Sequence, residues 1–92
     1  MLFVIFCIDR PGAADARRDN IQAHVDYVAA AEVTVVMSGP LVTDDGAAPL
    51  GSLLVVDAAD RAAADHFHRN DPLYKAGIWA TTELRAFDKR VG

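Results

Sequence analysis

The sequence lacks the features that mark several protein classes. Cys7 is the only cysteine among 92 residues, so the chain forms no internal disulfide and has no Cys-x-x-Cys pair for zinc or an iron–sulfur cluster. It has neither a G-x-G-x-x-G motif nor a P-loop, so we expect no cofactor. No apolar run approaches about 18 residues, and the opening MLFVIFCID has no basic leader. We therefore expect a cytoplasmic protein that does not bind a membrane.

Basic charge is scarce as well. Nine Lys and Arg stand against 13 Asp and Glu, for a net charge of −4. Because the basic residues are scattered and nucleic acid requires a concentrated basic face, we expect no nucleic-acid partner. The length fits a single domain over residues 1–92. Of the hydrophobic residues, 17 are alanine, so the core is small, and small domains often gain stability by oligomerising.

Apolar patterns and turn signals predict the secondary structure. We expect strands at 2–8, 33–43, 51–56 and 78–87, helices at 15–31 and 58–69, and one helical turn at 73–76. Pro40 cannot donate to a ladder, so the second strand needs a bulge or an edge position there. Asp57 is the candidate N-cap of the second helix. In the last strand, alternation assigns Trp79 to the face opposite Ile78 and Leu84.

The element order β-α-β-β-α-β predicts an α+β fold of the ferredoxin-like type. In this fold an antiparallel four-stranded sheet carries both helices on one face. The strands at 2–8 and 51–56 are apolar on both sides, so the second sheet face also needs cover. We therefore predict a homodimer in which two sheets pack face to face.

The three histidines are the first candidates for acid–base chemistry. His66 and His68 are two positions apart on a helix, so they cannot both point into one site. A metal site of His66, His68 and Asp71 would lack the i, i+4 spacing of helical zinc ligands, and we expect no metal. His24 borders the apolar stripe of the first helix, where it is either a packed core residue or a functional one.

Asp71 is a possible partner of His24. Pro72 restricts its backbone, and the fold brings a residue of the first helix near one just past the second. Alternatively, Asp71 only ends the helix or caps the next turn. Spacing leaves both interpretations open. Tyr74, close behind Asp71, is a candidate pocket residue, whereas Tyr27 and Trp79 are expected in the core or an interface.

Several segments resemble the YciI-like (YCII-related) family over essentially the whole chain. They are MLFVIFCID, RRDNIQAHVDYV with Arg17 and His24, SGPL at 38–41, Gly51-Ser52, and NDPLYKAGIWATTELRAF. The resemblance implies a dimeric α+β barrel with a dyad of His24 and Asp71. Ser38, Gly39 and Pro40 would line its pocket, with Arg17 contributing to substrate binding. The chain departs from the family at Ile21, where members often carry an arginine.

A His–Asp dyad restricts the chemistry. A carboxylate bonded to one imidazole nitrogen fixes the tautomer and leaves the other nitrogen free to exchange a proton. Ser38 lacks the G-x-S-x-G context of a nucleophile. We therefore expect a cofactor-independent enzyme that isomerises a small organic molecule or eliminates a group from it, as dehydrochlorinase-like relatives do with chlorinated hydroxyquinols. The alternatives are a non-catalytic small-ligand-binding or accessory module and a cofactor-free monooxygenase.

Overall fold

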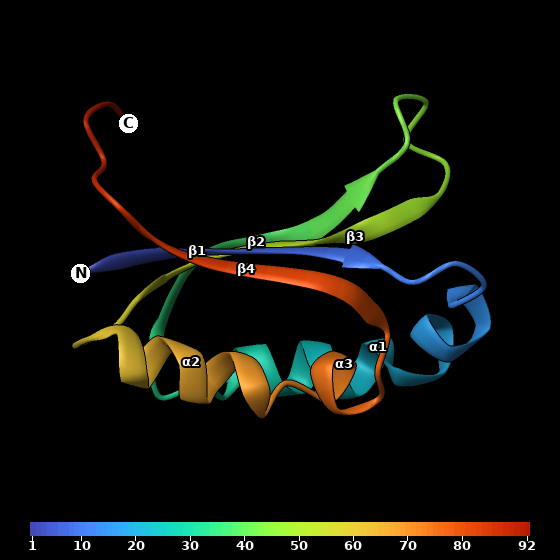
Figure 1. Ribbon diagram of the computed structural model, residues 1–92, viewed down its shortest axis with the longest axis horizontal. Coiled ribbons are helices and arrows are strands. Elements are labelled where there is room, and N and C mark those ends of the chain that lie inside the picture. The colour runs from blue at the N-terminus through green and yellow to red at the C-terminus, as the bar shows by residue number, and fades with distance from the viewer.

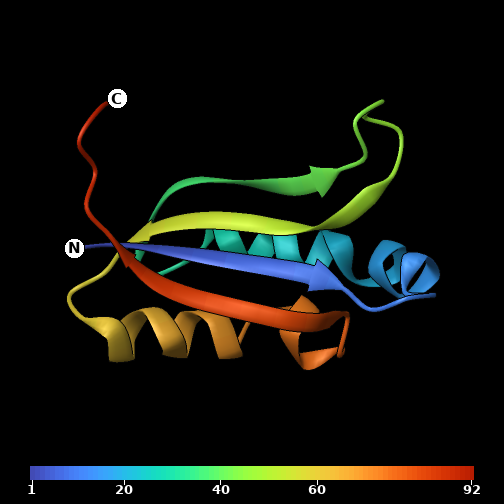
Figure 2. The same cartoon turned by 45° about the horizontal axis from the view of Figure 1, so that its top comes forward.

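The computed structural model describes residues 1–92 as one sheet covered by helices. Its elements are β1 (Leu2–Asp9), α1 (Ala14–Ala29), β2 (Thr34–Val42), β3 (Pro49–Asp57), α2 (Arg61–Arg69), α3 (Pro72–Lys75) and β4 (Trp79–Phe87). The strands pair antiparallel in the order β2-β3-β1-β4 (Figure 2). All three helices lie on one side of the sheet (Figure 1). The predicted α+β fold with a four-stranded antiparallel sheet is confirmed, and no helix has the length and apolar character to cross a membrane.

The core lies between the sheet and the helices. Phe3, Ile5 and Cys7 of β1 point toward the helices and are buried. Ile5 pairs with Leu54 of β3 and with Leu84 of β4, both also buried. Alternate residues of a strand share a face, so the apolar pattern of the central strands determines which side chains form the core.

The opposite sheet face is apolar and open. In β1 it carries Leu2, Val4, Phe6 and Ile8, the residues that alternate with the buried ones. The segment after β4 rises from the sheet on this side (Figure 1). It borders a cavity of about 400 Å³ lined by Leu2, Val4, Val36, Met37, Leu53, Val55, Phe87, Lys89, Val91 and Gly92. The two-sided apolar character that motivates the dimer prediction is thus present in the fold.

The sequence predicts local structure at Pro40 and at Asp57, and the structure bears out the first of these. Pro40 lies on β2, the edge strand, as its missing N–H requires. The register shifts of this strand fall elsewhere, between Val35 and Met37 and between Leu41 and Val42. Asp57 as N-cap of the second helix is wrong. The cap is Asp60, whose extended backbone lets its side chain accept a hydrogen bond from the Ala63 amide at 2.8 Å.

A β-bulge changes the orientation of the residue that begins β4. Ile8 pairs with Thr81 and Asp9 with Trp79, so one extra residue of β4 interrupts the alternation. Trp79 therefore faces the helices, not the open side that strict alternation predicts. Its ring stacks on His68 with centroids 5.3 Å apart.

Candidate active site

His24 and Asp71 form a buried pair between α1 and the start of α3. The His24 Nδ1 lies 2.9 Å from both carboxylate oxygens of Asp71, although 47 positions separate the two residues. His24 is 9% exposed and Asp71 only 1%. Because a carboxylate at this distance accepts, Nδ1 donates the hydrogen bond and the ring carries its proton there. In the neutral imidazole this arrangement leaves the lone pair on Nε2.

The local sequence fixes the Asp71 carboxylate independently of His24. Asp71 is the N-cap of α3, and its Oδ1 accepts a hydrogen bond from the Leu73 amide at 2.9 Å. Pro72 occupies the first turn of that helix, where its fixed φ is favourable and its missing N–H costs nothing. The capping role and the pairing with His24, which the sequence leaves as alternatives, therefore coexist in one carboxylate.

A cavity of about 490 Å³ opens beside the dyad. It is lined by Arg17, Ile21, His24, Val25, Val28, Ala29, Ser38, Gly39, Pro40 and Ser52. His24 contributes to this lining and Asp71 does not, so the imidazole edge remote from Asp71, with Nε2, faces the cavity. The structure thus brings Arg17, His24 and the segment 38–40 to one place.

Arg17 is held by the protein rather than left free. The buried residues of α1 are Arg17 and His24, two turns apart on the same face of the helix. The Arg17 Nη1 lies 2.8 and 3.0 Å from the two carboxylate oxygens of Asp9, at the end of β1. Its Nη2 donates to the Gly51 carbonyl at 3.0 Å and to the Ser52 hydroxyl at 2.9 Å. Its charge is therefore matched by Asp9 before any ligand arrives.

Ser52 and Asp9 are site residues that the sequence reasoning missed as such. Ser52 is 1% exposed and points from β3 toward the helices, at a position where the strand otherwise buries Leu54 and Val56. A polar residue in that inward series is the signal that identifies it. Its neighbour Gly51 allows β3 to approach β1, because a Cβ at this position would overlap the Cys7 carbonyl oxygen.

Tyr74 lies outside this cavity. Its ring contacts His68 edge-on, with centroids 5.0 Å apart, and the Arg69 guanidinium lies 6.0 Å from its centroid. Cys7 lies beneath the site, and burial together with the charges of Asp71 and Asp9 raises its pKa to about 12. The thiol therefore stays protonated and is a poor nucleophile.

The other histidines do not join the dyad. His66 is exposed on α2, whereas His68 is buried and its Nε2 has no hydrogen-bond partner. Burial lowers the pKa of His68 below the ordinary 6.5, while the neighbouring Asp71 acts in the opposite direction. No three His, Cys, Asp or Glu side chains are grouped closely enough to hold a metal ion.

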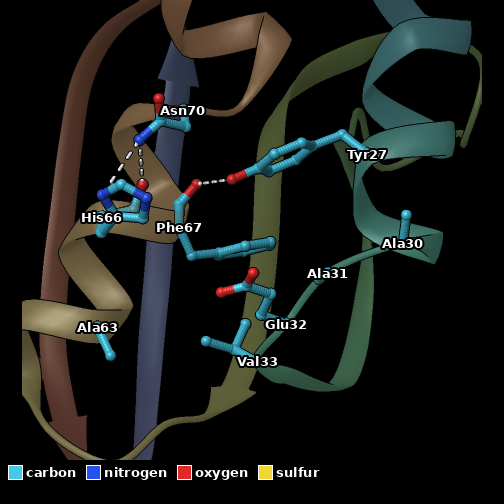
Figure 3. A pocket seen from close by; sticks show the side chains of 9 residues that line it. All are labelled: Tyr27, Ala30, Ala31, Glu32, Val33, Ala63, His66, Phe67 and Asn70. Carbon is cyan, nitrogen blue, oxygen red and sulfur yellow. Dashed lines mark hydrogen bonds between the residues drawn. The ribbon is translucent and has the colours of Figure 1, made fainter.

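A second cavity, of about 410 Å³, lies between the end of α1 and α2 (Figure 3). Two of its polar side chains are bonded to backbone carbonyls of α2. The Asn70 amide nitrogen lies 2.8 Å from the His66 carbonyl, and the Tyr27 hydroxyl donates to the Phe67 carbonyl at 2.8 Å. It contains neither member of the dyad, so the cavity beside His24 is the candidate active site.

The fold and this site define a small α+β domain with a buried His–Asp dyad at the edge of a cavity. A family model, the YCII-related domain, matches residues 1–88. The chain belongs to the YCII-related family.

Solved structures share this fold. A 5-chloro-2-hydroxyhydroquinone dehydrochlorinase from Burkholderia phenoliruptrix, in complex with 2,5-dihydroxybenzoquinone, is 33% identical with a TM-score of 0.87; the match covers 96% of this chain and 94% of that one. An antibiotic biosynthesis monooxygenase from Bacteroides thetaiotaomicron is 16% identical with a TM-score of 0.62, covering 99% and 90%. Another monooxygenase of that description is 22% identical with a TM-score of 0.60, covering 99% and 100%. At these last identities the likeness shows a shared fold alone. No curated protein matches the chain with significance.

Proposed function

We propose that this protein is a cofactor-independent enzyme that moves protons on a small hydroxylated ring, with His24 as general acid and base. The observation that carries the proposal is the 2.9 Å contact of Nδ1 with Asp71, made while the same imidazole lines a cavity of about 490 Å³. An imidazole with Nδ1 bonded to a carboxylate keeps a lone pair on Nε2 that can accept a ligand proton. Asp71 holds the ring and does not touch the ligand.

Ser52 supports a role for the cavity in stabilising negative charge on oxygen. Its hydroxyl accepts a hydrogen bond from Arg17 at 2.9 Å, and the chain offers its own proton no acceptor. That proton is free to donate to a ligand oxygen. A donor fixed in advance stabilises an oxyanion more than a mobile one, because it needs no reorganisation during the reaction. Arg17, itself fixed by Asp9, provides this preorganisation.

These groups suit a tautomerisation followed by an elimination. Nε2 takes the proton of a ring hydroxyl, and the electron pair of that O–H bond forms a carbonyl. The π electrons displaced from the ring then bond a proton, given back by the imidazolium, to the carbon that bears the leaving group. Return of the proton at another carbon would complete an isomerisation. Removal of a second hydroxyl proton forms another carbonyl and expels the leaving group as an anion. The net change is loss of the leaving group and one proton, without an oxidant or reductant.

The relative of 33% identity supports the substrate class. Its name gives a chlorinated hydroxyhydroquinone as substrate and its complex holds a dihydroxybenzoquinone. A cavity of about 490 Å³ falls within the range of small-molecule sites and exceeds the needs of a single ring. We therefore propose hydroxylated rings that carry a leaving group as substrates of this chain.

The test uses 5-chloro-2-hydroxyhydroquinone and measures chloride release. We expect turnover by the natural chain and a loss of about 100-fold or more in kcat for His24→Gln, because general base catalysis contributes on this order. Asp71→Asn keeps an amide oxygen for the α3 cap, so a comparable loss would reflect the dyad. The exposed His66→Gln is the matched control and should retain full activity.

Binding without turnover would contradict the enzyme and favour the alternative, a non-catalytic ligand-binding module on the same fold. Calorimetry with 2,5-dihydroxybenzoquinone separates the two. Under the enzyme proposal, His24→Gln lowers kcat far more than it weakens binding of this quinone. Equal chloride release by the natural chain and His24→Gln would exclude His24 as the base.

A further inference from the structure

We propose that Tyr27 is a positioning residue for the His24–Asp71 dyad, acting through the last turn of α2. Two side-chain contacts made by hydrogen bonds connect α1 with the segment from α2 to α3. One is the dyad itself. The other is the Tyr27 hydroxyl, which donates to the Phe67 backbone carbonyl at 2.8 Å (Figure 3). The orientation of α1 against the Asp71 segment therefore depends on Tyr27 as well as on the dyad.

The two links are neighbours along both elements. Tyr27 follows His24 by three residues on α1, which places both on one face of the helix. Phe67 precedes Asp71 by four residues, the length of one helical turn. The Tyr27 and Phe67 rings also stack, with centroids 5.3 Å apart and planes 17° from parallel. A shift of Tyr27 is thus transmitted to the dyad over a single turn.

The Phe67 carbonyl needs the Tyr27 hydroxyl because of its place in α2. The last carbonyls of a helix lack intrahelical donors. The amides of Asn70 and Asp71 bond to the carbonyls of His66 and His68, which leaves Phe67 to Tyr27. Tyr27 therefore fixes the turn from which the chain passes directly into Asp71.

Tyr27 makes this hydrogen bond from outside the candidate active site. It lines the cavity of Figure 3 and not the one beside His24. Burial raises the pKa of its phenol above the ordinary 10.0, and the charges of Asp71 and Glu32 raise it further. The hydroxyl therefore keeps its proton and stays a donor throughout the neutral pH range.

The test compares Tyr27→Phe with Tyr74→Phe. The first variant keeps the ring stack and loses only the donor. The second removes the same hydroxyl from a residue of α3 that makes no link to α1 and lies outside the cavity beside His24. ¹⁵N NMR of the ring nitrogens, at a pH where the imidazole is neutral, reports the His24 tautomer. We expect the natural chain and Tyr74→Phe to hold the proton on Nδ1, and Tyr27→Phe to divide it between the two nitrogens.

Phe67→Leu separates the hydrogen bond from the packing. It removes the ring stack but keeps the backbone carbonyl, so the tautomer should remain that of the natural chain. The proposal is overturned if Tyr27→Phe holds the proton on Nδ1 as the natural chain does. The proposal is also overturned if Phe67→Leu divides the His24 proton between the two nitrogens to the same extent as Tyr27→Phe. Packing alone would then position the dyad.

The kinetic part of the test rests on the proposed function. Tyr27→Phe should lower kcat by about tenfold, since small misplacements of a catalytic group cost factors of this order or more. KM should change by less than about twofold, since uniform binding is unaffected. Failure of the natural chain to turn over any hydroxylated ring would contradict the proposed enzyme, while the NMR comparison would still decide the role of Tyr27.

Discussion

Arg17 and Asp9 form an ion pair beneath the candidate active site, in which the single nitrogen Nη1 lies 2.8 and 3.0 Å from the two carboxylate oxygens. Their side chains are 6% and 12% exposed. The pair joins the first buried turn of α1 to the end of β1, and it holds the guanidinium that donates to Ser52. A charge that appears from the sequence to be available for a substrate is therefore part of the scaffold.

Asp9→Asn should destabilise the fold. It leaves the buried guanidinium without its counter-charge, and removing one partner of a buried pair typically costs about 3–5 kcal/mol. Chemical denaturation measures the change in the free energy of unfolding. The matched control is Asp15→Asn, which breaks the exposed pair with Arg18 and should cost at most about 1 kcal/mol. Equal losses in the two variants would show that the Arg17–Asp9 pair is not buried in solution.

Gly51→Ala should also destabilise the fold, by about 1–3 kcal/mol, because overpacking forces strands apart. The new Cβ would overlap the Cys7 carbonyl oxygen, and β1 cannot move away without breaking its ladder to β3. Gly39→Ala is the control, since its Cβ would meet nothing within 4 Å. Thermal unfolding distinguishes the two variants, and a Tm for Gly51→Ala equal to that of the natural chain would contradict the close approach of the strands.

The stability of the fold should fall in mild acid because of His68. Burial lowers the pKa of His68 in the folded state, so below about pH 6.5, the ordinary value, the unfolded chain binds more protons. The free energy of unfolding therefore decreases as the pH falls through this window, by at most about 1.4 kcal/mol per pH unit for one group. Denaturation curves at several pH values measure the slope.

His68→Phe keeps a ring against Trp79 and removes the titrating group, so this variant should lose that part of the slope. His66→Gln is the control, because His66 is exposed. An unchanged slope in His68→Phe would assign the acid sensitivity to other groups.

The open sheet face predicts association. We propose that a second copy of this chain covers it, because it presents Leu2, Val4, Phe6 and Ile8 in one row. Phe6→Asp should convert a dimer into a monomer of about half the mass in light scattering. Ala62→Lys places a charge on the exposed side of α2 instead and should leave the dimer intact. A natural chain that is monomeric at micromolar concentration would rule the association out.

Much of the fold follows from the sequence because the determining signals are local. Alternation in β1 identifies its buried face, and Pro40 requires an edge strand. Strict alternation places Trp79 on the wrong face because a bulge shifts the register of β4, and one extra residue in a ladder leaves no mark in an apolar pattern. Asp57 is the expected cap because Ala58 follows it, whereas the extended backbone of Asp60 and its hydrogen bond from the Ala63 amide identify Asp60 as the cap.

The candidate site follows less directly from local sequence signals. The proximity of His24 and Asp71 depends on the packing of two distant elements, and spacing alone left the pair unresolved. The resemblance to the family named the pair, and the structure places the two side chains 2.9 Å apart. Asp9 and Ser52 were missed because their roles come from hydrogen bonds to Arg17, which connect three separate elements.

The dyad has a consequence for how the chain must mature. His24 belongs to the first half of the chain, β1-α1-β2, and Asp71 to the second half, which runs from β3 to β4. The strands of the two halves alternate in the sheet, in the order β2-β3-β1-β4. Neither half can assemble the pair by itself. A nascent or truncated chain that ends before Asp71 cannot form the pair, so the dyad is completed only when the last quarter of the polypeptide begins to dock.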